Sequence, residues 1–179
     1  MRNNLLIIGA TSGIIIACLK SFLKNKYKIT ATYSKEESLL HIPNSLRKSK
    51  NIKFIKLNLN EKDEKILEIL KKNKVNPNMI INAVGGSFGI KDYPYSLDSW
   101  QKLLNLNILK HILINNFFLK KMINNKFGRI LFFSTSAVED TNASIAYSTS
   151  KAFLENYVIK SASLFGKYNI LINCVKSSV

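Results

Sequence analysis

Tyr147 and Lys151 are separated by three residues, a spacing that could serve proton transfer. On a helix, residues i and i+4 lie on one face, so the phenol and the ammonium group would be neighbours. A nearby cation favours the phenolate and lowers the phenol pKa from about 10 toward neutral pH. Such a tyrosine can donate or accept a proton in catalysis. The spacing alone is common, and two exposed side chains on a helix surface would produce it as well.

Further polar residues lie beside apolar segments that could position them. Ser134 follows the apolar segment 129–133 and lies thirteen residues before Tyr147, and Thr135 is its neighbour. Asn107 lies among leucines and isoleucines in a segment of helical periodicity, where a polar residue needs a reason. The simpler alternative for Asn107 is an exposed helix asparagine in an asparagine-rich chain.

A five-residue turn, Gly9–Gly13, lies between two strongly apolar runs near the start of the chain. One interpretation is a phosphate-binding turn, in which a buried strand ends at Ile8 and a helix begins near Gly13 or Ile14. Backbone N–H groups at such a helix start point toward an anion. The alternative interpretation is a secretory signal, because a short basic start precedes the apolar run.

Apolar segments of strand length alternate with segments of helical periodicity along the chain. Strands that are apolar on both faces and separated by helices form parallel sheets covered on two sides. We therefore predict an α/β fold, a doubly wound parallel sheet covered by helices on both faces, within one domain over 1–179. A cleaved signal would remove the central strand of this sheet, so the phosphate-binding turn is favoured. The expected strands cover 5–8, 28–33, 51–59, 79–84, 129–133 and 168–175. The expected helices cover 14–25, a segment capped by Asn60, a segment from Ser96 or Ser99 to Asn124, and 146–165, ending at Gly166.

The chain of 179 residues carries a formal net charge of +16, which raises the question of nucleic-acid binding. Its lysines are spread along the whole sequence without a basic stripe interleaved with aromatic residues. We therefore predict a solvated basic surface and no nucleic-acid partner. No apolar run reaches the roughly 18 residues of a membrane span, so no membrane association is predicted. Cys18 and Cys174 lack the spacing of a metal site and suit free thiols in a reducing, cytoplasmic location; no metal is predicted.

Taken in order, these features resemble the short-chain dehydrogenase/reductase family, and the resemblance covers essentially the whole chain. The family has a glycine turn, an Asn-Asn-Ala-Gly strand end, a helix asparagine at a fixed distance from an upstream tryptophan, and a catalytic serine, tyrosine and lysine. The matching positions are Gly9 to Ile14, Asn82 to Gly85 (with Ala83 for the second asparagine), Trp100 to Asn107, Gly128 to Ile130, Ser134, Tyr147 and Lys151.

The resemblance implies a Rossmann-like fold in three α/β/α layers and a single NAD(P)-binding domain over 1–179. It also implies hydride transfer between a nicotinamide cofactor and a small-molecule carbonyl or alcohol. Tyr147 would be the general acid or base, and Lys151 would bind the nicotinamide ribose and lower the phenol pKa. Ser134 would hydrogen-bond the substrate oxygen, and Asn107 would hold a water in the proton relay. A homodimer or homotetramer is also implied. The implied cofactor-binding residues are Gly9, Thr11, Ser12, Gly13, Ile14, Tyr33, Ser34, Asn58, Leu59, Asn82, Ala83, Gly85, Tyr147 and Lys151.

The assignment of the catalytic hydroxyl has two solutions. Counting back from Tyr147 with the family spacing gives Ser134, whereas counting forward from Gly128 gives Thr135. Loops absorb deletions more easily than strands do, which favours Thr135, because a slip of one residue reverses every strand side chain. The spacing to Tyr147 favours Ser134, and Ser134 is the residue that we predict.

Cofactor preference depends on the end of the second expected strand. An NAD site normally places an acidic residue there to bind both ribose hydroxyls. This chain has Thr32, Tyr33, Ser34 and Lys35, and the first acid is Glu36. A hydroxyl and an ammonium group suit a 2′-phosphate, so NADP(H) is favoured over NAD(H).

The sequence also departs from the family pattern. Ile15 occupies the position of the third glycine, where a β-branched side chain would crowd the helix, strand and cofactor. Ser177-Ser178 replaces the usual Pro-Gly, and the chain stops at Val179 although family members continue further. We therefore expect a C-terminally truncated member. The alternative to an enzyme is a non-catalytic remnant that binds a nucleotide or serves as an interaction module.

Overall fold

The computed structural model describes residues 3–90 and 94–177, which form two compact units that meet at the bond between Ala83 and Val84. The departures at Ser178 and Val179 lie outside these described residues. Within the described residues, no helix combines the length and the apolar character needed to cross a bilayer.

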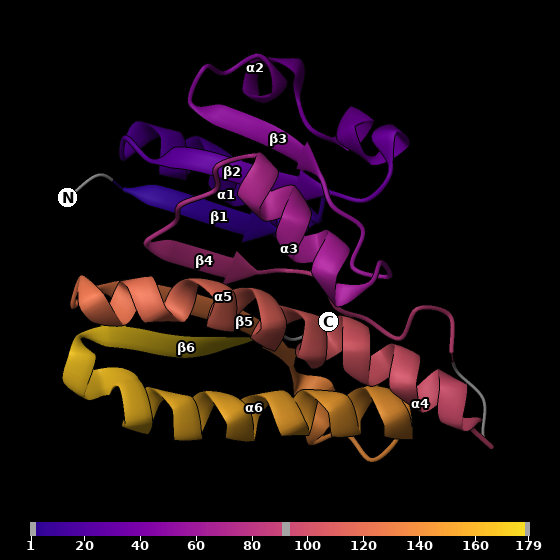
Figure 1. Ribbon diagram of the computed structural model, residues 1–179. Coiled ribbons are helices and arrows are strands. Elements are labelled where there is room, and N and C mark those ends of the chain that lie inside the picture. The colour runs from indigo at the N-terminus through magenta and orange to yellow at the C-terminus, as the bar shows by residue number, and fades with distance from the viewer. Residues whose placement is uncertain (1–2, 91–93, 178–179) are drawn as a thin grey trace. The chain divides into compact units, whose positions relative to one another are not determined.

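The first unit is built on four parallel strands in the order β3-β2-β1-β4 (Figure 1). Leu5 of β1 pairs with Ile29 of β2 on one side and with Met79 of β4 on the other. The unit consists of β1 (Asn4–Ile8), α1 (Gly13–Lys24), β2 (Lys28–Tyr33), a 3-10 helix (Glu36–His41), α2 (Asn44–Arg47), β3 (Ile52–Lys56), α3 (Asp63–Lys72) and β4 (Met79–Asn82).

The core of this unit explains why β1 is apolar on both faces. Leu6, Ile7 and Ile8 are fully buried, and Ile15 and Leu19 of α1 add one apolar helix face to them. Burial of each such side chain contributes roughly 1.5–3 kcal/mol relative to exposure. Strand β1 is therefore the centre of this part of the sheet, as the sequence predicts.

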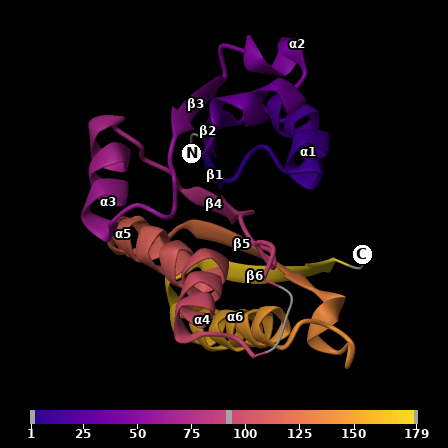
Figure 2. The same ribbon diagram turned by 90° about the vertical axis from the view of Figure 1, so that its right-hand side faces the viewer.

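The second unit pairs two parallel strands and packs long helices against them. Residue Gly128 pairs with Ile170, and the register continues to Thr135 and Ser177. Helix α6 runs between the two strands in the chain, and Figure 2 shows it side by side with α4. The unit consists of α4 (Leu97–Leu104), a π-helical turn (Asn105–Leu109), α5 (Lys110–Asn124), β5 (Gly128–Thr135), a 3-10 turn (Ser136–Val138), α6 (Ile145–Phe165), a second 3-10 turn (Gly166–Tyr168) and β6 (Ile170–Ser177).

The long helix begins at the first of its two predicted starts. The Ser96 hydroxyl accepts a hydrogen bond from the Ser99 N–H at 3.1 Å, which is the N-cap interaction that stabilises a first turn. The helical run then continues to Asn124, as expected. The π-helical turn in its middle is not predicted by the apolar spacing.

Several predicted boundaries are wrong by a few residues. Strand β3 ends at Lys56, not at residue 59, and β4 ends at Asn82, not at residue 84. Asn60 does not cap α3, because the helix begins at Asp63 with Lys62 at its N-cap position. Asn60 lies in a preceding turn, in which its N–H is bound by the Asn58 side chain at 3.0 Å. The side chain of Asn58 thus forms a local turn instead of a cap.

Helix α6 ends at Phe165 and is followed by Gly166, as predicted, but Gly166 is not the residue that reverses the chain. Gly166 has a right-handed backbone (φ −54°, ψ −38°) and continues into a 3-10 turn. The left-handed residue is Asn169, with φ 59°. An asparagine tolerates this conformation better than other non-glycine residues do, so it reverses the chain here in place of the expected glycine.

Candidate active site

Helix α6 places Tyr147 and Lys151 on one face at the carboxyl end of β5. The Lys151 side chain is buried, and its ammonium group donates a hydrogen bond to the Phe133 carbonyl at 2.7 Å. The same nitrogen lies 5.9 Å from the centre of the Tyr147 ring. Tyr147, which is half-buried, and Lys151, which is buried, are therefore neighbours and not two independent exposed side chains.

Burial changes the titration of this lysine. It lowers the pKa of Lys151 from 10.5 to about 8, and the nearby Cys174 opposes the change. Burial disfavours the charged form of a lysine because the ammonium group loses water. A perturbed lysine in a cluster of polar groups is typical of functional sites.

The pKa of Tyr147 is raised, whereas the sequence argument expected Lys151 to lower it. Burial of the phenol is the larger cause, and a hydrogen bond with the Thr135 side chain partly opposes it. Lys151 does not offset the burial here, because its ammonium group is directed to the Phe133 carbonyl and lies to one side of the ring. Tyr147 is consequently a protonated phenol at neutral pH in this arrangement.

The structure places the two candidate hydroxyls of β5 in different surroundings. Ser134 donates a hydrogen bond to a Glu155 carboxylate oxygen at 2.6 Å, which engages its proton away from the phenol. Thr135 hydrogen-bonds Tyr147 and also accepts the Ala137 N–H at 3.2 Å, which starts the following 3-10 turn. Both residues are buried, and Thr135 is the one whose side chain acts to lower the pKa of the Tyr147 phenol.

Asn107 lies in the π-helical turn and is buried, which excludes the alternative of an exposed helix asparagine. Its side-chain amide makes two hydrogen bonds to Gly86, donating to the carbonyl at 3.0 Å and accepting from the N–H at 2.9 Å. Single π turns inside α-helices are frequent at functional sites, because the wider turn redirects one side chain. Here the redirected amide holds the chain that follows β4.

Gly85 lies directly against this pair of polar groups. A Cβ atom at this position would be 2.7 Å from the Lys151 ammonium nitrogen and 3.0 Å from the Asn107 amide oxygen. A Cβ at that distance would force the Lys151 ammonium group to move aside, so only glycine leaves that group in its present place. The match of Gly85 to the family motif thus has a steric reason in this chain.

His111 is a member of this cluster that the sequence argument does not include. Its Nε2 lies 2.9 Å from the Val84 carbonyl, and its ring packs edge-on against Phe132 with centroids 6.5 Å apart. Burial lowers the pKa of His111 to about 4, so the ring is neutral and Nε2 donates to the carbonyl. Its position four residues after Asn107, on the same helix face, is the signal that could have indicated it.

The glycine turn of the first unit has the features of an anion site. Gly9 has φ 86°, a conformation that favours glycine, and its N–H is bound by the Thr32 hydroxyl at 3.1 Å. Helix α1 begins at Gly13 without a side-chain cap and without an acidic residue in its first turn. A Cβ on Gly13 would meet no atom within 4 Å. Free N–H groups and open space at a helix start fit a phosphate group.

The other residues of the turn and of the start of α1 differ in their exposure to solvent. Ile14 is exposed, while Ile15 is buried in the core on the same helix face as Leu19. Thr11 and Ser12 lie in the turn itself and are half-buried. The Ile15 side chain is therefore part of the core packing of α1.

At the carboxyl end of β2, the first acidic residue is already engaged. The Tyr33 phenol donates to the Glu36 carboxylate at 3.1 Å, and Lys56 lies 3.5 Å from the same oxygen. Ser34 and Lys35 are exposed. A positively charged side chain thus offsets Glu36, the first acid after β2, a feature that the sequence order alone does not reveal.

The remaining predicted cofactor residues lie at strand ends of the first unit. Asn58 and Leu59 follow β3, and Leu59 is buried. Asn82 ends β4, and the Ala83 N–H continues the ladder to the Ile8 carbonyl at 2.8 Å. All of them are at the carboxyl side of their strands, as in sheets of this type.

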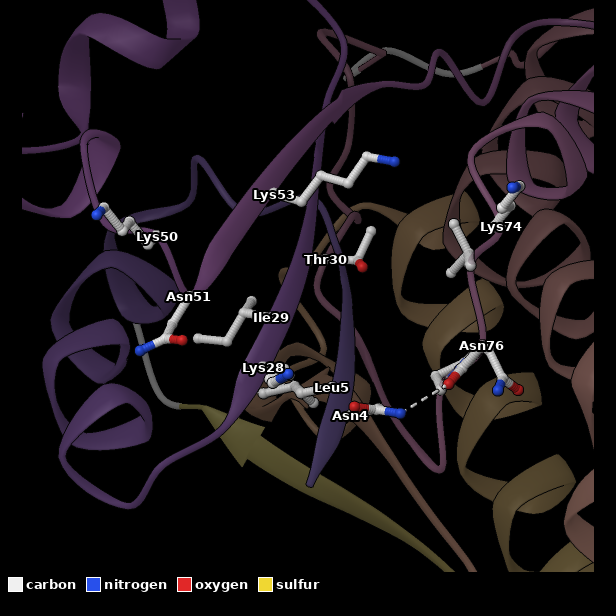
Figure 3. Close-up of a pocket in the computed structure, with 12 residues that line it drawn as sticks. Asn4, Leu5, Lys28, Ile29, Thr30, Lys50, Asn51, Lys53, Lys74 and Asn76 are labelled. Atoms are coloured by element: carbon white, nitrogen blue, oxygen red, sulfur yellow. Dashed lines mark hydrogen bonds between the residues drawn. The ribbon is translucent and has the colours of Figure 1, made fainter. Parts of the chain in front are cut away.

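A separate cavity of about 320 Å³ lies at the other end of these strands (Figure 3). Its lining includes Lys28, Lys50, Lys53 and Lys74, and none of the predicted site residues. Lys53 donates to the Asn73 carbonyl at 3.0 Å, so part of this basic lining is used in local structure.

The sequence profile of the short chain dehydrogenase family matches residues 3–179, and the chain belongs to this family. The uncharacterized oxidoreductase YvrD of Bacillus subtilis (strain 168) is 28% identical over 173 residues, covering 95% of this chain. The L-rhamnose 1-dehydrogenase (NADP(+)) of Thermoplasma acidophilum is 27% identical over 184 residues, covering 97% of this chain. The solved structure of ElxO with NADP bound covers all of this chain at 28% identity, with a TM-score of 0.82.

These similarities confirm the predicted family and the Rossmann-like α/β fold class. The chain spans 65% of the length of YvrD, 70% of the length of the rhamnose dehydrogenase and 74% of the ElxO chain. The chain is therefore short relative to these members of the family, as expected.

Proposed function

We propose that the chain is an NAD(P)-dependent oxidoreductase that interconverts a carbonyl and an alcohol, with Tyr147 as the proton donor or acceptor. The observation that carries the proposal is the cluster on α6 and β5. It combines a phenol hydrogen-bonded to Thr135 with a buried ammonium group at 5.9 Å from the phenol ring. Membership of the short-chain dehydrogenase family supports the same chemistry.

Each side chain of the cluster has a proposed role. Tyr147 donates its Oη proton to the substrate oxygen during reduction, which its raised pKa supports, because the phenol stays protonated at neutral pH. Thr135 supplies a second hydroxyl to that oxygen, in place of Ser134, because Thr135 is bonded to the phenol. Lys151 would bind the nicotinamide ribose and help to reprotonate Tyr147 after the phenol has donated its proton. Asn107, which is fixed by its two hydrogen bonds to Gly86, would hold the water of the proton relay.

We propose NADP(H) as the preferred cofactor. When bound, its nicotinamide ring supplies or accepts the hydride. The uncapped start of α1 and the turn from Gly9 to Gly13 would hold the pyrophosphate, and Ser34 and Lys35 would meet the 2′-phosphate. The relatives support this preference in part, since ElxO is solved with NADP and the 4-hydroxyisoleucine dehydrogenase with NADH.

The proposal is tested by titrating the purified chain with NADPH and with NADH, followed by turnover with a panel of small aldehydes, ketones and aldoses. We expect tighter binding of NADPH and carbonyl-dependent loss of its absorbance. Binding of the dinucleotide without turnover of any carbonyl or alcohol would instead support the non-catalytic alternative.

The assignment of the second hydroxyl gives a direct comparison. Thr135→Val should lower kcat about tenfold to a hundredfold, because it removes one donor to the substrate oxygen while keeping the side-chain shape. Ser134→Ala should leave kcat nearly unchanged, because its proton is directed to Glu155. Steady-state kinetics of both variants check this, and the opposite order would reassign the role to Ser134.

We also propose that the enzyme is a homodimer or homotetramer. Helix α6 exposes Ile145, Phe153, Ile159 and Leu164, each at least half exposed. A helix with this many exposed apolar side chains is typical of an interaction surface.

A further inference from the structure

His111 is buried and bonded, yet it has no role in the proposed proton transfer. Only 1% of its surface is exposed, and its Nε2–H donates to the Val84 carbonyl at 2.9 Å. Val84 is the residue before Gly85, whose backbone lies against the Lys151 ammonium group. The imidazole therefore contacts the chain at the point where that chain meets the site.

Three hydrogen bonds from one helix hold residues 84–86, which we call the wall segment. Asn107 makes two of them, to the Gly86 N–H and carbonyl, and His111 makes the third, to the Val84 carbonyl. The two side chains are four residues apart and bracket Gly85 from both sides along the chain. Gly85 has no side chain with which to fix itself, so these bonds determine how closely its backbone approaches Lys151.

We infer that His111 is a positioning residue, which acts through the wall segment to hold the Lys151 ammonium group beside Tyr147. The inference rests on the proposed function, because it assigns importance to the site that Lys151 and Tyr147 form. It also adds to that function, since His111 touches neither of the proposed reacting groups by a hydrogen bond.

Burial keeps the ring neutral, although the two carbonyls around it favour the protonated form. Phe132 of β5 packs against one edge, the backbone carbonyls of Val84 and Leu106 lie near the ring, and Lys151 of α6 is the charged group close enough to oppose its protonation. The groups that face Lys151 in turn are Cys174 of β6 and Tyr147 of its own helix. A second cation beside Lys151 would repel it, so the low pKa of His111, about 4, preserves the arrangement.

The competing explanation is that His111 only fills space in the core. That explanation predicts a loss of stability in every variant, without a specific change at Lys151. The positioning role predicts that variants with and without a donor differ at Lys151 even when they are equally stable. Glutamine can donate to the Val84 carbonyl with its side-chain amide, whereas methionine and leucine cannot.

The test is the titration of Lys151 in the complete 179-residue chain carrying ¹³C-labelled lysine. The Lys151 signal is assigned by its disappearance in Lys151→Arg, and its pKa should be about 8 in the wild type. In His111→Met and His111→Leu it should move upward toward the ordinary value, because a loosened wall segment admits water. In His111→Gln it should stay near the wild-type value. Ile114→Val, a change at a fully buried residue of α5, is the control for core packing and should also leave it unchanged.

Turnover supplies the second readout. We expect kcat of the donor-less variants to fall about tenfold to a hundredfold, with a much smaller change in KM for NADPH, because catalytic geometry is lost while binding is retained. Methionine adapts to irregular spaces, so His111→Met remains informative if His111→Leu does not fold. If neither donor-less variant folds while Ile114→Val does, a role confined to core stability is the result and the inference is overturned.

The outcomes separate this inference from the proposed function. A shifted Lys151 titration in the donor-less variants, together with a wild type that turns over no substrate, would refute the oxidoreductase and retain the positioning role. An active wild type whose donor-less variants titrate and turn over normally would refute the positioning role alone. Equal changes in His111→Gln and His111→Met would also refute it, because the donor would then be irrelevant.

Discussion

Tyr147→Phe should reduce carbonyl reduction by at least about a hundredfold while NADPH binding is retained. General acid catalysis by a positioned side chain contributes about 10²–10⁴-fold, and phenylalanine has no proton to donate. The substitution removes one oxygen and its hydrogen bond with Thr135, and it leaves the ring and the neighbouring Lys151 in place. The measurements are kcat with the best carbonyl substrate and the dissociation constant of NADPH.

Tyr157→Phe is the matched control for this prediction. Tyr157 lies on the same helix, its pKa is also raised by burial, and it also hydrogen-bonds a hydroxyl, that of Ser161. Its ring packs edge-on against Phe132 at 6.0 Å, outside the site cluster. We expect normal turnover in Tyr157→Phe. Comparable losses in both variants would mean that helix stability, and not the Tyr147 proton, explains the effect.

Gly85→Ala should lower turnover about tenfold to a hundredfold with little change in the thermal unfolding midpoint. The added Cβ would be 2.7 Å from the Lys151 nitrogen, and this nitrogen is the end of a flexible side chain that can move aside. Moving aside preserves the fold but breaks the hydrogen bond to the Phe133 carbonyl and separates the ammonium group from Tyr147. The measurements are kcat and the midpoint of thermal unfolding.

Two other glycines provide contrasting controls. Gly166→Ala should change neither quantity appreciably, because a Cβ there meets no atom within 4 Å and the backbone is right-handed. Gly128→Ala should lower stability by about 1–3 kcal/mol, because its Cβ would be 2.8 Å from the Met122 sulfur in the core. The interpretation of Gly85 is wrong if Gly85→Ala unfolds as readily as Gly128→Ala, or if its turnover is normal.

Much of the fold follows from periodicity, because buried parallel strands are apolar on both faces. This pattern predicts β2 at Lys28–Tyr33 to the residue, and it predicts the end of β1 at Ile8. Boundaries are wrong where a side chain competes with the backbone, as Asn58 does when it binds the Asn60 N–H. The end of α6 at Phe165, before Gly166, is predicted correctly, but the left-handed residue that reverses the chain is Asn169, which the sequence pattern does not indicate.

In the candidate site, too, residue spacing predicts some features, whereas others depend on contacts between separate elements. Spacing on a helix predicts that Tyr147 and Lys151 share a face, and they do. Spacing cannot choose between Ser134 and Thr135, because the choice depends on which hydroxyl Glu155 engages. It also cannot reveal the burial that raises the Tyr147 pKa. These effects depend on residues from separate elements, which sequence order does not bring together.

The π-helical turn at Asn105–Leu109 has a consequence for how this chain can evolve. A wide turn is equivalent to one residue inserted into an α-helix, and an α-helix advances 3.6 residues per turn. Deleting one residue there would restore regular backbone hydrogen bonding and rotate everything upstream by more than a quarter of a turn. Asn107 and His111 could then no longer both reach the chain after β4. A shorter, regular helix would therefore gain backbone hydrogen bonding and lose the two side-chain contacts that hold residues 84–86.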